Sequence, residues 1–261
     1  MKIWKTYKQF FKSSFQRELE FRANFFAKVI QSAIWMIFFV LIIAVIYRNT
    51  DSVAGWSEGQ SYVLVATVFF MDAFVSAIFS GNLQELPEKV RKGMLDFDIV
   101  KPMDTQALVS IRKFNFDQIG TLIVGIGMIF VGLRMDGSVP TGVNVLSYAV
   151  FVFAAIAIFY SFELMLMTLG IWLVRVDNLW VLGETVFSVA RFPTDIYSLP
   201  VRKFLTYGLP LALIATEPTR VLLGSRPTWF SLYGVCWALI FLLISRIFFK
   251  FALSRYTSAS S

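Results

Sequence analysis

Few side chains in this sequence have the chemistry for acid–base or nucleophilic catalysis. The chain has no histidine, which is the commonest general base, and its single cysteine, Cys236, lies inside an apolar segment. A zinc site of the usual Cys and His ligands is therefore excluded, and one cysteine cannot form an intramolecular disulfide. We predict no catalytic residues and no metal site, and the residue types favour an enzymatic function only weakly.

Three carboxylic acids stand out because they lie inside or beside long apolar stretches: Asp72, Glu163 and Glu184. A charge at the centre of a bilayer costs at least about 2.5–3.5 kcal/mol, so such residues face protein or water rather than lipid. One interpretation is that they line a path for a substrate or a proton. The other, which is favoured, is that they pair with a basic residue or with backbone at a helix interface, or lie near the headgroups. Glu184 has Arg175 and Arg191 as candidate partners, whereas none can be named for Asp72.

The composition indicates that these acids belong to a protein that folds in a membrane rather than in water. Hydrophobic residues make up 57% of the 261 residues and charged residues only 16%, and 28 residues are phenylalanine. A soluble domain is typically about half apolar and about a quarter charged. Such a chain has too little polar surface for a water-soluble fold. We therefore predict an all-α integral membrane protein with a single transmembrane domain over residues 1–261.

Six apolar segments are candidates to cross or enter the bilayer, whose hydrocarbon core takes about 20 apolar residues to cross. They are Val29–Tyr47, Tyr62–Phe79, Ile119–Leu133, Val145–Leu173, Leu179–Ala190 and Trp229–Phe249. The fifth is the weakest, and without it the C-terminus would lie on the opposite side of the membrane. Four glycines in or next to the third segment favour close helix packing, namely Gly120, Gly125, Gly127 and Gly132.

Residues 1–22 predict an amphipathic helix, because apolar and basic side chains fall on opposite arcs at 100° per residue. The apolar arc consists of Ile3, Trp4, Tyr7, Phe10, Phe11 and Phe15, and the basic arc of Lys2, Lys5, Lys8 and Lys12. This pattern is typical of a helix lying in the headgroup plane of an anionic leaflet. The alternative is a solvated run of charge before the first span.

Charge also predicts the orientation. With six spans and the N-terminus inside, 17 of the 24 lysines and arginines are cytoplasmic and 7 are outside. The positive-inside rule then favours both termini in the cytoplasm.

Two regions between the spans are unlike simple connections. Residues 82–113 form a long polar cytoplasmic segment, in which Pro87 suits the first turn of a short helix and Gly93 its end, so that residues 85–96 predict one helix. Residues 192–227 contain five prolines, which break a helix into pieces. Apolar but broken segments are tolerated where they pack on protein or line a cavity. We expect two short helices there that dip into the outer leaflet and return.

At this point the sequence resembles the ABC type 2 transporter permeases over essentially its whole length. Two stretches carry the resemblance to a bacterial subgroup of about 260 residues. They are Arg91-Lys92-Gly93-Met94-Leu95-Asp96 followed by Ile99-Val100-Lys101-Pro102, and Arg191-Phe192-Pro193, Ile196-Tyr197, Leu209-Pro210, Glu217-Pro218 and Leu223-Gly224.

The resemblance implies a six-span exporter subunit in the bacterial cytoplasmic (inner) membrane, with re-entrant outer helices between spans five and six. It also implies a coupling helix between spans two and three that docks on an ATPase through Glu88, Lys89, Arg91, Lys92, Gly93, Met94, Leu95 and Asp96. Because no phosphate-binding loop occurs in this sequence, ATP and magnesium would be bound by a separate cytoplasmic ATPase dimer and no cofactor by this chain. The implied partners are that dimer, a second permease chain, the same or homologous, and membrane lipids, with no nucleic acid.

Two other functions stay open. One is a membrane enzyme that acts on lipid headgroups, for which the nearest acidic pair is Asp96 and Asp98, without a further acidic cluster. The other is a membrane assembly subunit that does not transport. The substrate of a transporter, amphipathic or lipid-linked, is not specified by these residues.

Overall fold

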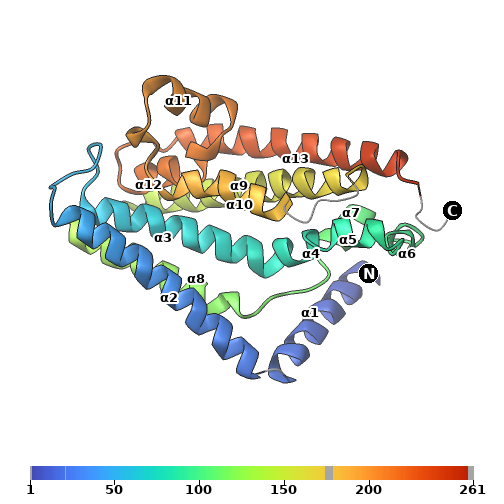
Figure 1. Ribbon diagram of the computed structural model, residues 1–261. Coiled ribbons are helices and arrows are strands. Elements are labelled where there is room, and N and C mark those ends of the chain that lie inside the picture. Colours follow the sequence, from blue (N-terminus) through green and yellow to red (C-terminus); the bar gives the residue numbers. More distant parts are fainter. Residues whose placement is uncertain (1, 21, 174–178, 258–261) are drawn as a thin grey trace.

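The computed structural model describes residues 2–20, 22–173 and 179–257, and their regular structure is helical apart from one isolated β-bridge between Val53 and Trp56. The longer helices are α1 (Lys2–Glu20), α2 (Arg22–Tyr47), α3 (Glu58–Val75), α8 (Gln118–Asp136), α9 (Gly142–Thr168), α10 (Leu179–Ser188) and α13 (Phe230–Ser254). Short helices α4 (Gly81–Leu83), α5 (Leu86–Arg91), α6 (Asp96–Ile99) and α7 (Thr105–Ser110) gather at one end of the bundle with the end of α13 (Figure 1). We call this the terminal end. The end with the α2–α3 and α8–α9 loops is the far end.

Five helical stretches are long and apolar enough to cross a membrane: Phe25–Tyr47, Glu58–Arg91, Gln118–Asp136, Gly142–Ile171 and Phe230–Ser254. The chain is therefore a multi-pass membrane protein. The predicted fifth segment is not among them. It forms α10 and the short helix η3 (Val189–Arg191), which together are shorter than the about 20 residues that a crossing takes.

The segment around α10 nevertheless connects the two ends of the bundle. At its start, Leu179 is buried in one apolar cluster with Leu83 and Leu95 of the terminal end. Past its end, the carboxylate of Asp195 accepts a hydrogen bond of 2.9 Å from the indole of Trp56, in the far-end loop between α2 and α3. The chain thus passes from one end of the molecule to the other between Leu179 and Asp195.

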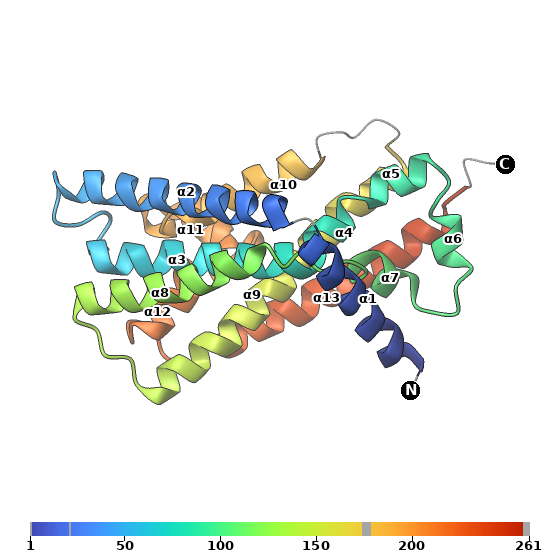
Figure 2. The same ribbon diagram turned by 90° about the horizontal axis from the view of Figure 1, so that it is seen from below.

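Helices α3 and α9 form the centre of the bundle: 12 of the 18 residues of α3 and 13 of the 27 residues of α9 are buried. Helix α3 packs most extensively on α8, and α9 on α13, while α2, α3 and α8 run side by side (Figures 1 and 2). The α3–α8 contact depends on Gly59 and Gly132: a Cβ on Gly132 would lie 2.7 Å from the backbone oxygen of Gly59 and 2.9 Å from the backbone nitrogen of Val63. Small residues here let two backbones meet, as expected for helices that pack in lipid.

Helix α3 continues into the terminal end through a π-helical turn, η1 (Ser76–Ser80), followed by α4 and α5. A π-turn disrupts the regular pattern of backbone hydrogen bonds, and Asn115 supplies bonds at this point. Its backbone nitrogen donates to the oxygen of Ala77 at 2.8 Å and its side-chain nitrogen to the oxygen of Ser76 at 3.0 Å. The segment that leads into α8 is thereby fixed to the wide turn of α3.

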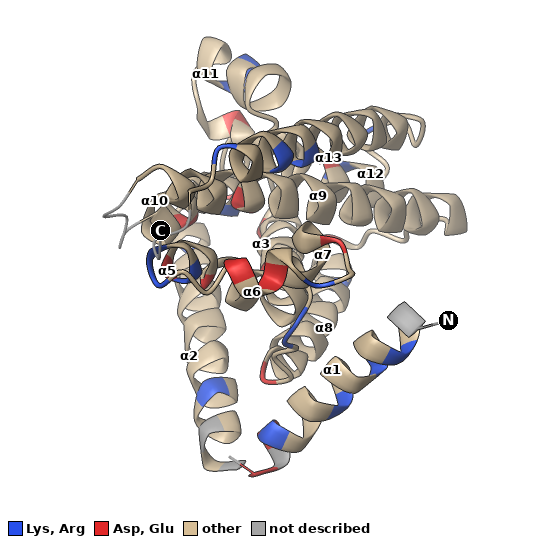
Figure 3. Ribbon diagram, turned by 90° about the vertical axis from the view of Figure 1, so that its right-hand side faces the viewer, with Lys and Arg blue, Asp and Glu red and all other residues tan. Residues whose placement is uncertain are grey.

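Helix α1 covers nearly all of the predicted range and stands away from the bundle at an angle to α2, with basic residues along its length (Figures 1 and 3). Lys5, Lys8 and Lys12 are exposed, whereas the side chain of Lys2 lies outside the described part of the chain. The rings of Phe11 and Phe15 pack edge-on against Phe116. Part of the apolar face therefore contacts the segment before α8.

Candidate functional site

The predicted helix over residues 85–96 is in fact two helices. Helix α5 has Pro87 in its first turn and ends at Arg91, and α6 begins at Asp96. Gly93 has a φ of +67°, in the left-handed region that favours glycine, and the backbone nitrogens of Met94 and Leu95 both donate to the oxygen of Lys89. Gly93 does end the first helix, but the chain turns there and starts a second one.

These short helices are packed firmly on the spans. Leu86 and Leu95 are fully buried in one cluster with Leu164 of α9 and Phe249 of α13. Just after α9, a Cβ on Gly170 would lie 2.8 Å from the ring of Pro87, so the backbone at Gly170 packs directly against that ring. The terminal end is thus joined to three long helices rather than hanging from α3 as a loose loop.

A buried carboxylate braces this region from within. Asp98 accepts hydrogen bonds from Lys89 at 3.0 Å and from Lys101 at 2.7 Å, and Arg112 lies 3.6 Å away. Burial raises the pKa of Asp98, and the hydrogen bonds and charges of Lys101 and Lys89 lower it. The lowering is larger, so the pKa of Asp98 lies below its ordinary value. Lys89, a predicted docking residue, is buried with it and points inward. The sequence suggests Asp98 only as one half of an acidic pair, and its three basic neighbours give it a structural role instead.

Three exposed apolar residues lie at intervals of three around α6, and we call them the tip: Met94 in the turn before the helix, Phe97 on it and Val100 at its end. These side chains are 41%, 70% and 79% exposed. Exposed apolar residues grouped in this way are typical of interaction sites. Phe97 and Val100 were not among the predicted docking residues. Val100 belongs to the stretch Ile99-Val100-Lys101-Pro102 that carries the resemblance, but only the fold shows that both side chains are exposed.

The charged predicted docking residues lie around the tip. Glu88, Arg91 and Lys92 are exposed, and Glu88 forms an ion pair of 2.5 Å with Lys92. Asp96 and Gly93 are half-buried, and Leu95 is buried beneath them.

Helix α7 ties this end to α9 and α13. Asp104 caps α7 by accepting from the backbone nitrogen of Ala107 at 3.0 Å, and it pairs with Arg246 of α13. The hydrogen bond from Arg246 is the main reason why the pKa of Asp104 lies below its ordinary value. On the other side, the hydroxyl of Tyr160 on α9 bonds with Gln106 at 3.0 Å and with Ser110 at 2.9 Å.

A second feature is a polar groove at membrane depth, with a volume of about 550 Å³. It lies between α2, α3, α8 and the α10–η3 segment. Its lining consists of Lys28, Gln31, Ser32, Trp35, Phe39, Phe69, Asp72, Ser76, Asp117, Gln118, Thr121, Glu184 and Arg191. Since the apolar stretches that can cross a membrane carry few charges, this concentration of polar groups marks the groove as a candidate site.

The groove contains two loose ion pairs and several groups without partners. Lys28 lies 3.4 Å from one oxygen of Asp117, and Arg191 lies 3.5 Å from Glu184. Asp72 makes no hydrogen bond or ion pair within the described residues. The other oxygen of Asp117 and the hydroxyl of Thr121 are buried without a partner in the same part of the chain.

The structure brings the three predicted acids close together. Asp72 and Glu184 line the groove, and Glu163 lines a small cavity beside it that Glu184 also borders. One oxygen of Glu163 accepts from Ser80 at 2.9 Å, and its other oxygen has no partner within the described residues. Of the two suggested partners of Glu184, Arg191 is in place, and Arg175 lies outside the described residues. Lys28 and Asp117 were missed, because 89 positions separate them in the sequence and neither lies inside an apolar segment.

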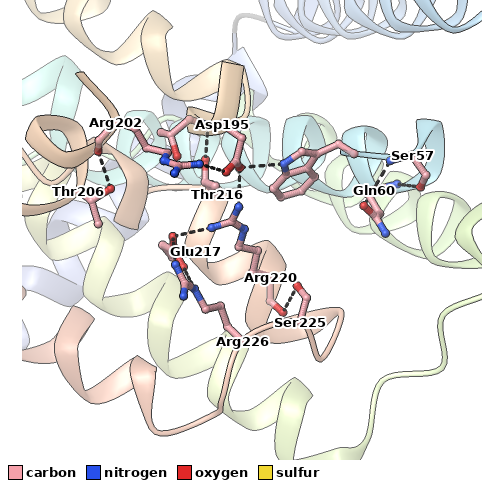
Figure 4. Close-up of polar contacts among 12 residues, drawn as sticks. Ser57, Gln60, Asp195, Arg202, Thr206, Thr216, Glu217, Arg220, Ser225 and Arg226 are labelled. Atoms are coloured by element: carbon pink, nitrogen blue, oxygen red, sulfur yellow. Dashed lines mark hydrogen bonds and ion pairs between the residues drawn. The ribbon is translucent and has the colours of Figure 1, made fainter. Parts of the chain in front are cut away.

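At the far end, residues 192–227 fold into short helical pieces, including α11 (Leu199–Lys203) and α12 (Thr216–Leu222). Two acids hold them together, the half-buried Asp195 and the buried Glu217 (Figure 4). Asp195 accepts from Arg202 at 2.9 Å and Arg220 at 2.6 Å, and Glu217 accepts from Arg226 at 2.8 Å. Burial raises the pKa of Asp195, but the hydrogen bonds from Trp56, Arg220 and Arg202 and the charge of Arg220 outweigh this, so that the pKa lies below its ordinary value.

One comparison with known proteins, with the models of protein families, gives a match. A family model described as ABC-2 family transporter protein matches residues 33–260, which is most of the chain. No curated protein and no solved structure matches it. The long apolar helices are those of a membrane subunit, and this family supplies such subunits to transporters that work with an ABC ATPase. The chain therefore belongs to the ABC-2 transporter family and is a membrane permease of an ABC-type transport system.

Proposed function

We propose that this permease is the membrane subunit of an exporter that moves an amphipathic or lipid-linked molecule outward across the bacterial cytoplasmic membrane. A partner subunit, which binds ATP and magnesium, drives it. The observation that carries the proposal is the tip, an exposed apolar surface on helices that are braced to three spans. The membrane subunit has no phosphate-binding loop in its sequence, so it must receive work through a physical contact.

In this proposal the tip is the contact with the ATPase. Phe97, Met94 and Val100 enter an apolar pocket of the partner, and Glu88, Arg91, Lys92 and Asp96 form a polar rim around them. Gly93 allows the turn that presents the tip. Lys89 and Leu95 support the tip from inside the protein and do not contact the ATPase, because Lys89 pairs with Asp98 and Leu95 is buried in the core cluster. A displacement of the ATPase is then transmitted to α3, α9 and α13 together.

The proposed topology has six crossings and both termini in the cytoplasm. The terminal end faces the cytoplasm, so that α1 lies on the inner leaflet with Lys2, Lys5, Lys8 and Lys12 toward the anionic headgroups. The path of the chain from Leu179 to Asp195 supports a crossing between the two ends, made by α10 and the residues after it. The broken helices at the far end would then lie in the outer leaflet.

The groove is the proposed route for the substrate. Asp72 and Glu184 lie in it, and Glu163 lies next to it, so these acids would contact a polar group as it enters the membrane domain. A cytoplasmic ATPase dimer needs two membrane partners, so a second permease chain, the same or homologous, completes the assembly. The two permeases and the ATPase dimer form the transporter.

The test is to purify this chain with its ATPase in lipid and to measure ATP hydrolysis and ATPase retention. Phe97→Asp should abolish retention of the ATPase, because it places a charge in an apolar contact. A matched control is Val139→Asp at the far end, where the side chain is 92% exposed. If Phe97→Asp retained the ATPase as well as Val139→Asp does, the tip would not be the coupling surface. If the unaltered chain associated with no ATPase at all, the exporter proposal would be wrong.

A further inference from the structure

The polar groove holds more acid than base. Asp72, Asp117 and Glu184 line it, against Lys28 and Arg191. Glu163 is a further acid next to it and has only a serine as its hydrogen-bond partner in the described structure. A site with this surplus attracts positive charge and disfavours anions. Its preference is therefore for a cation.

The hydrogen-bonding groups of the groove point to the same class of ligand. One oxygen of Asp117 and the hydroxyl of Thr121 are buried and unpartnered in the described structure. Asp72 is half-buried and makes no hydrogen bond or ion pair there. A carboxylate in its charged form can only accept hydrogen bonds. Buried polar groups are nearly always partnered, so these acceptors call for a ligand that donates. A protonated amine brings both the charge and the donors.

One side chain of the protein itself shows how the groove holds a cation. The guanidinium of Arg191 lies 3.5 Å from the carboxylate of Glu184 and 5.5 Å from the centre of the Phe39 ring. A carboxylate on one side and an aromatic face on the other are the features that bind organic cations. The rings of Trp35 and Phe69 line the same groove as Asp72, and these three residues make no ion pair or cation–π contact with a protein cation among the described residues.

The position of the groove indicates that this cation carries an apolar chain. Lys28 and Phe39 are eleven residues apart on α2, so the groove extends about 16 Å along that helix at 1.5 Å per residue. Beside it, α2 presents exposed apolar residues to the lipid, among them Ile34 and Phe38. A molecule that lies in the membrane can place its chain against α2 and its head in the groove.

We propose that the groove binds cationic amphipathic molecules, in which a protonated amine or an alkylated ammonium is joined to an alkyl chain. This inference rests on the proposed transport function and names the substrate class of that route. The head lies among Asp72, Asp117 and Thr121 and stacks on Trp35 or Phe69. Lys28 and Arg191 compete with the ligand for the same carboxylates.

The experiment uses the full chain in nanodiscs of phosphatidylcholine and three photoreactive probes with the same alkyl chain: dodecylamine, dodecanol and dodecyl sulfate, each with a diazirine in the chain. Saturable labelling of α2 and α8 is measured by peptide mass spectrometry. The amine should label these helices at concentrations where the alcohol and the sulfate do not. Equal labelling by all three probes would overturn the proposal, because it would show an apolar surface without charge selection.

Isosteric variants sharpen the test. Asp72→Asn and Asp117→Asn should each weaken saturable labelling by the amine about tenfold, since each removes one carboxylate from the site. Arg191→Gln should strengthen it, because it removes the internal competitor for Glu184. The control is Asp51→Asn, an exposed acid in the α2–α3 loop, which should change nothing. Thermal unfolding of each variant establishes that it is folded, and if Asp72→Asn fails to fold, Glu184→Gln takes its place.

The results separate this inference from the transport function. If the chain retains its ATPase but the acid variants leave amine labelling unchanged, or if Arg191→Gln weakens labelling as the acid variants do, the substrate class is wrong and the exporter proposal is untouched. If the amine labels the groove selectively and no ATPase associates, the binding site stands and the exporter proposal fails.

Discussion

The terminal end and the polar groove each contain a buried carboxylate, Asp98 and Asp117, with a second acid beside it, but the partners of these acids differ. At the terminal end, Asp98 is shared by two lysines and an arginine, and Asp104 is held by Arg246. In the groove, Asp72 has no ion pair in the described structure and one oxygen of Asp117 has no partner there. The acids of the far end are paired like those of the terminal end, because Asp195 and Glu217 each form ion pairs with two arginines.

The difference separates structural acids from acids that are available to a ligand. A buried charge that is fully paired fixes the groups around it, and removal of one partner leaves the other charge uncompensated. An acid that the fold leaves without a partner contributes little to holding the fold together. Its desolvation is a cost that the rest of the protein offsets. Substitutions in the two regions should therefore have opposite consequences for stability and binding.

The largest effect is expected for Asp98→Ala. It leaves the buried ammonium of Lys89 without its carboxylate, and breaking a buried pair costs about 3–5 kcal/mol. Chemical unfolding in detergent would measure this loss, with the exposed Asp51→Ala as the control, for which a change within about 0.5 kcal/mol is expected. Equal stability of the two variants would mean that Asp98 is no more structural than a surface acid, and the comparison would fail at the terminal end.

Phe97→Asp should weaken binding of the ATPase to the tip without changing the stability of the terminal end. The side chain is 70% exposed, so the free energy of unfolding should change by less than about 0.5 kcal/mol. Its affinity for the ATPase should fall at least about thirtyfold, because loss of an aromatic anchor at the centre of an interface costs about 2 kcal/mol or more. Unfolding and ATPase titration on one preparation would measure both. A variant that lost stability as well would show that Phe97 belongs to the core.

Acidification should weaken the paired regions first. Asp98, Asp104 and Asp195 have a pKa below the ordinary value in the folded protein. Their contribution to stability is therefore fully present above the unfolded pKa of about 3.9 and is lost as pH falls below it through the folded pKa. Thermal unfolding between about pH 5 and pH 3 should show this loss, and Asp195→Asn should make the curve flatter. A curve that is the same for both proteins would contradict this account of the far end.

The smallest change is expected for Asp72→Asn. Because no ion pair is broken, the free energy of unfolding should stay within about 1 kcal/mol of the unaltered chain, with stabilisation the expected direction. The measurement is the same unfolding experiment used for Asp98→Ala. A loss comparable to that of Asp98→Ala would show that Asp72 is structural, and the comparison between the regions would break at the groove.

The long apolar helices could be predicted from the sequence, because a run of about 20 residues with few charges has the length and composition that a membrane crossing requires. The short helices of the terminal end were harder, since Gly93 marks an end but does not say what begins three residues later. The groove could not be foreseen in full. Asp72 and Glu184 were conspicuous among apolar neighbours, but Lys28 and Asp117 meet only because α2 and α8 both lie against α3. Likewise, the sequence does not distinguish Lys89 from an exposed lysine, because its burial depends on the position of Asp98 in the fold.

The stretch from Glu58 to Arg91 has a mechanical consequence. Its 34 residues extend about 51 Å, whereas the hydrocarbon core is only about 30 Å thick. In the proposed topology, about 20 Å of this helical stretch extends beyond the hydrocarbon core at the end that carries α5. Such an arm converts angle into distance: a tilt of about 10° at one end displaces the other by about 9 Å. The Gly59–Gly132 contact lies near the far end of this stretch. The helix would therefore move least at this contact when its other end tilts.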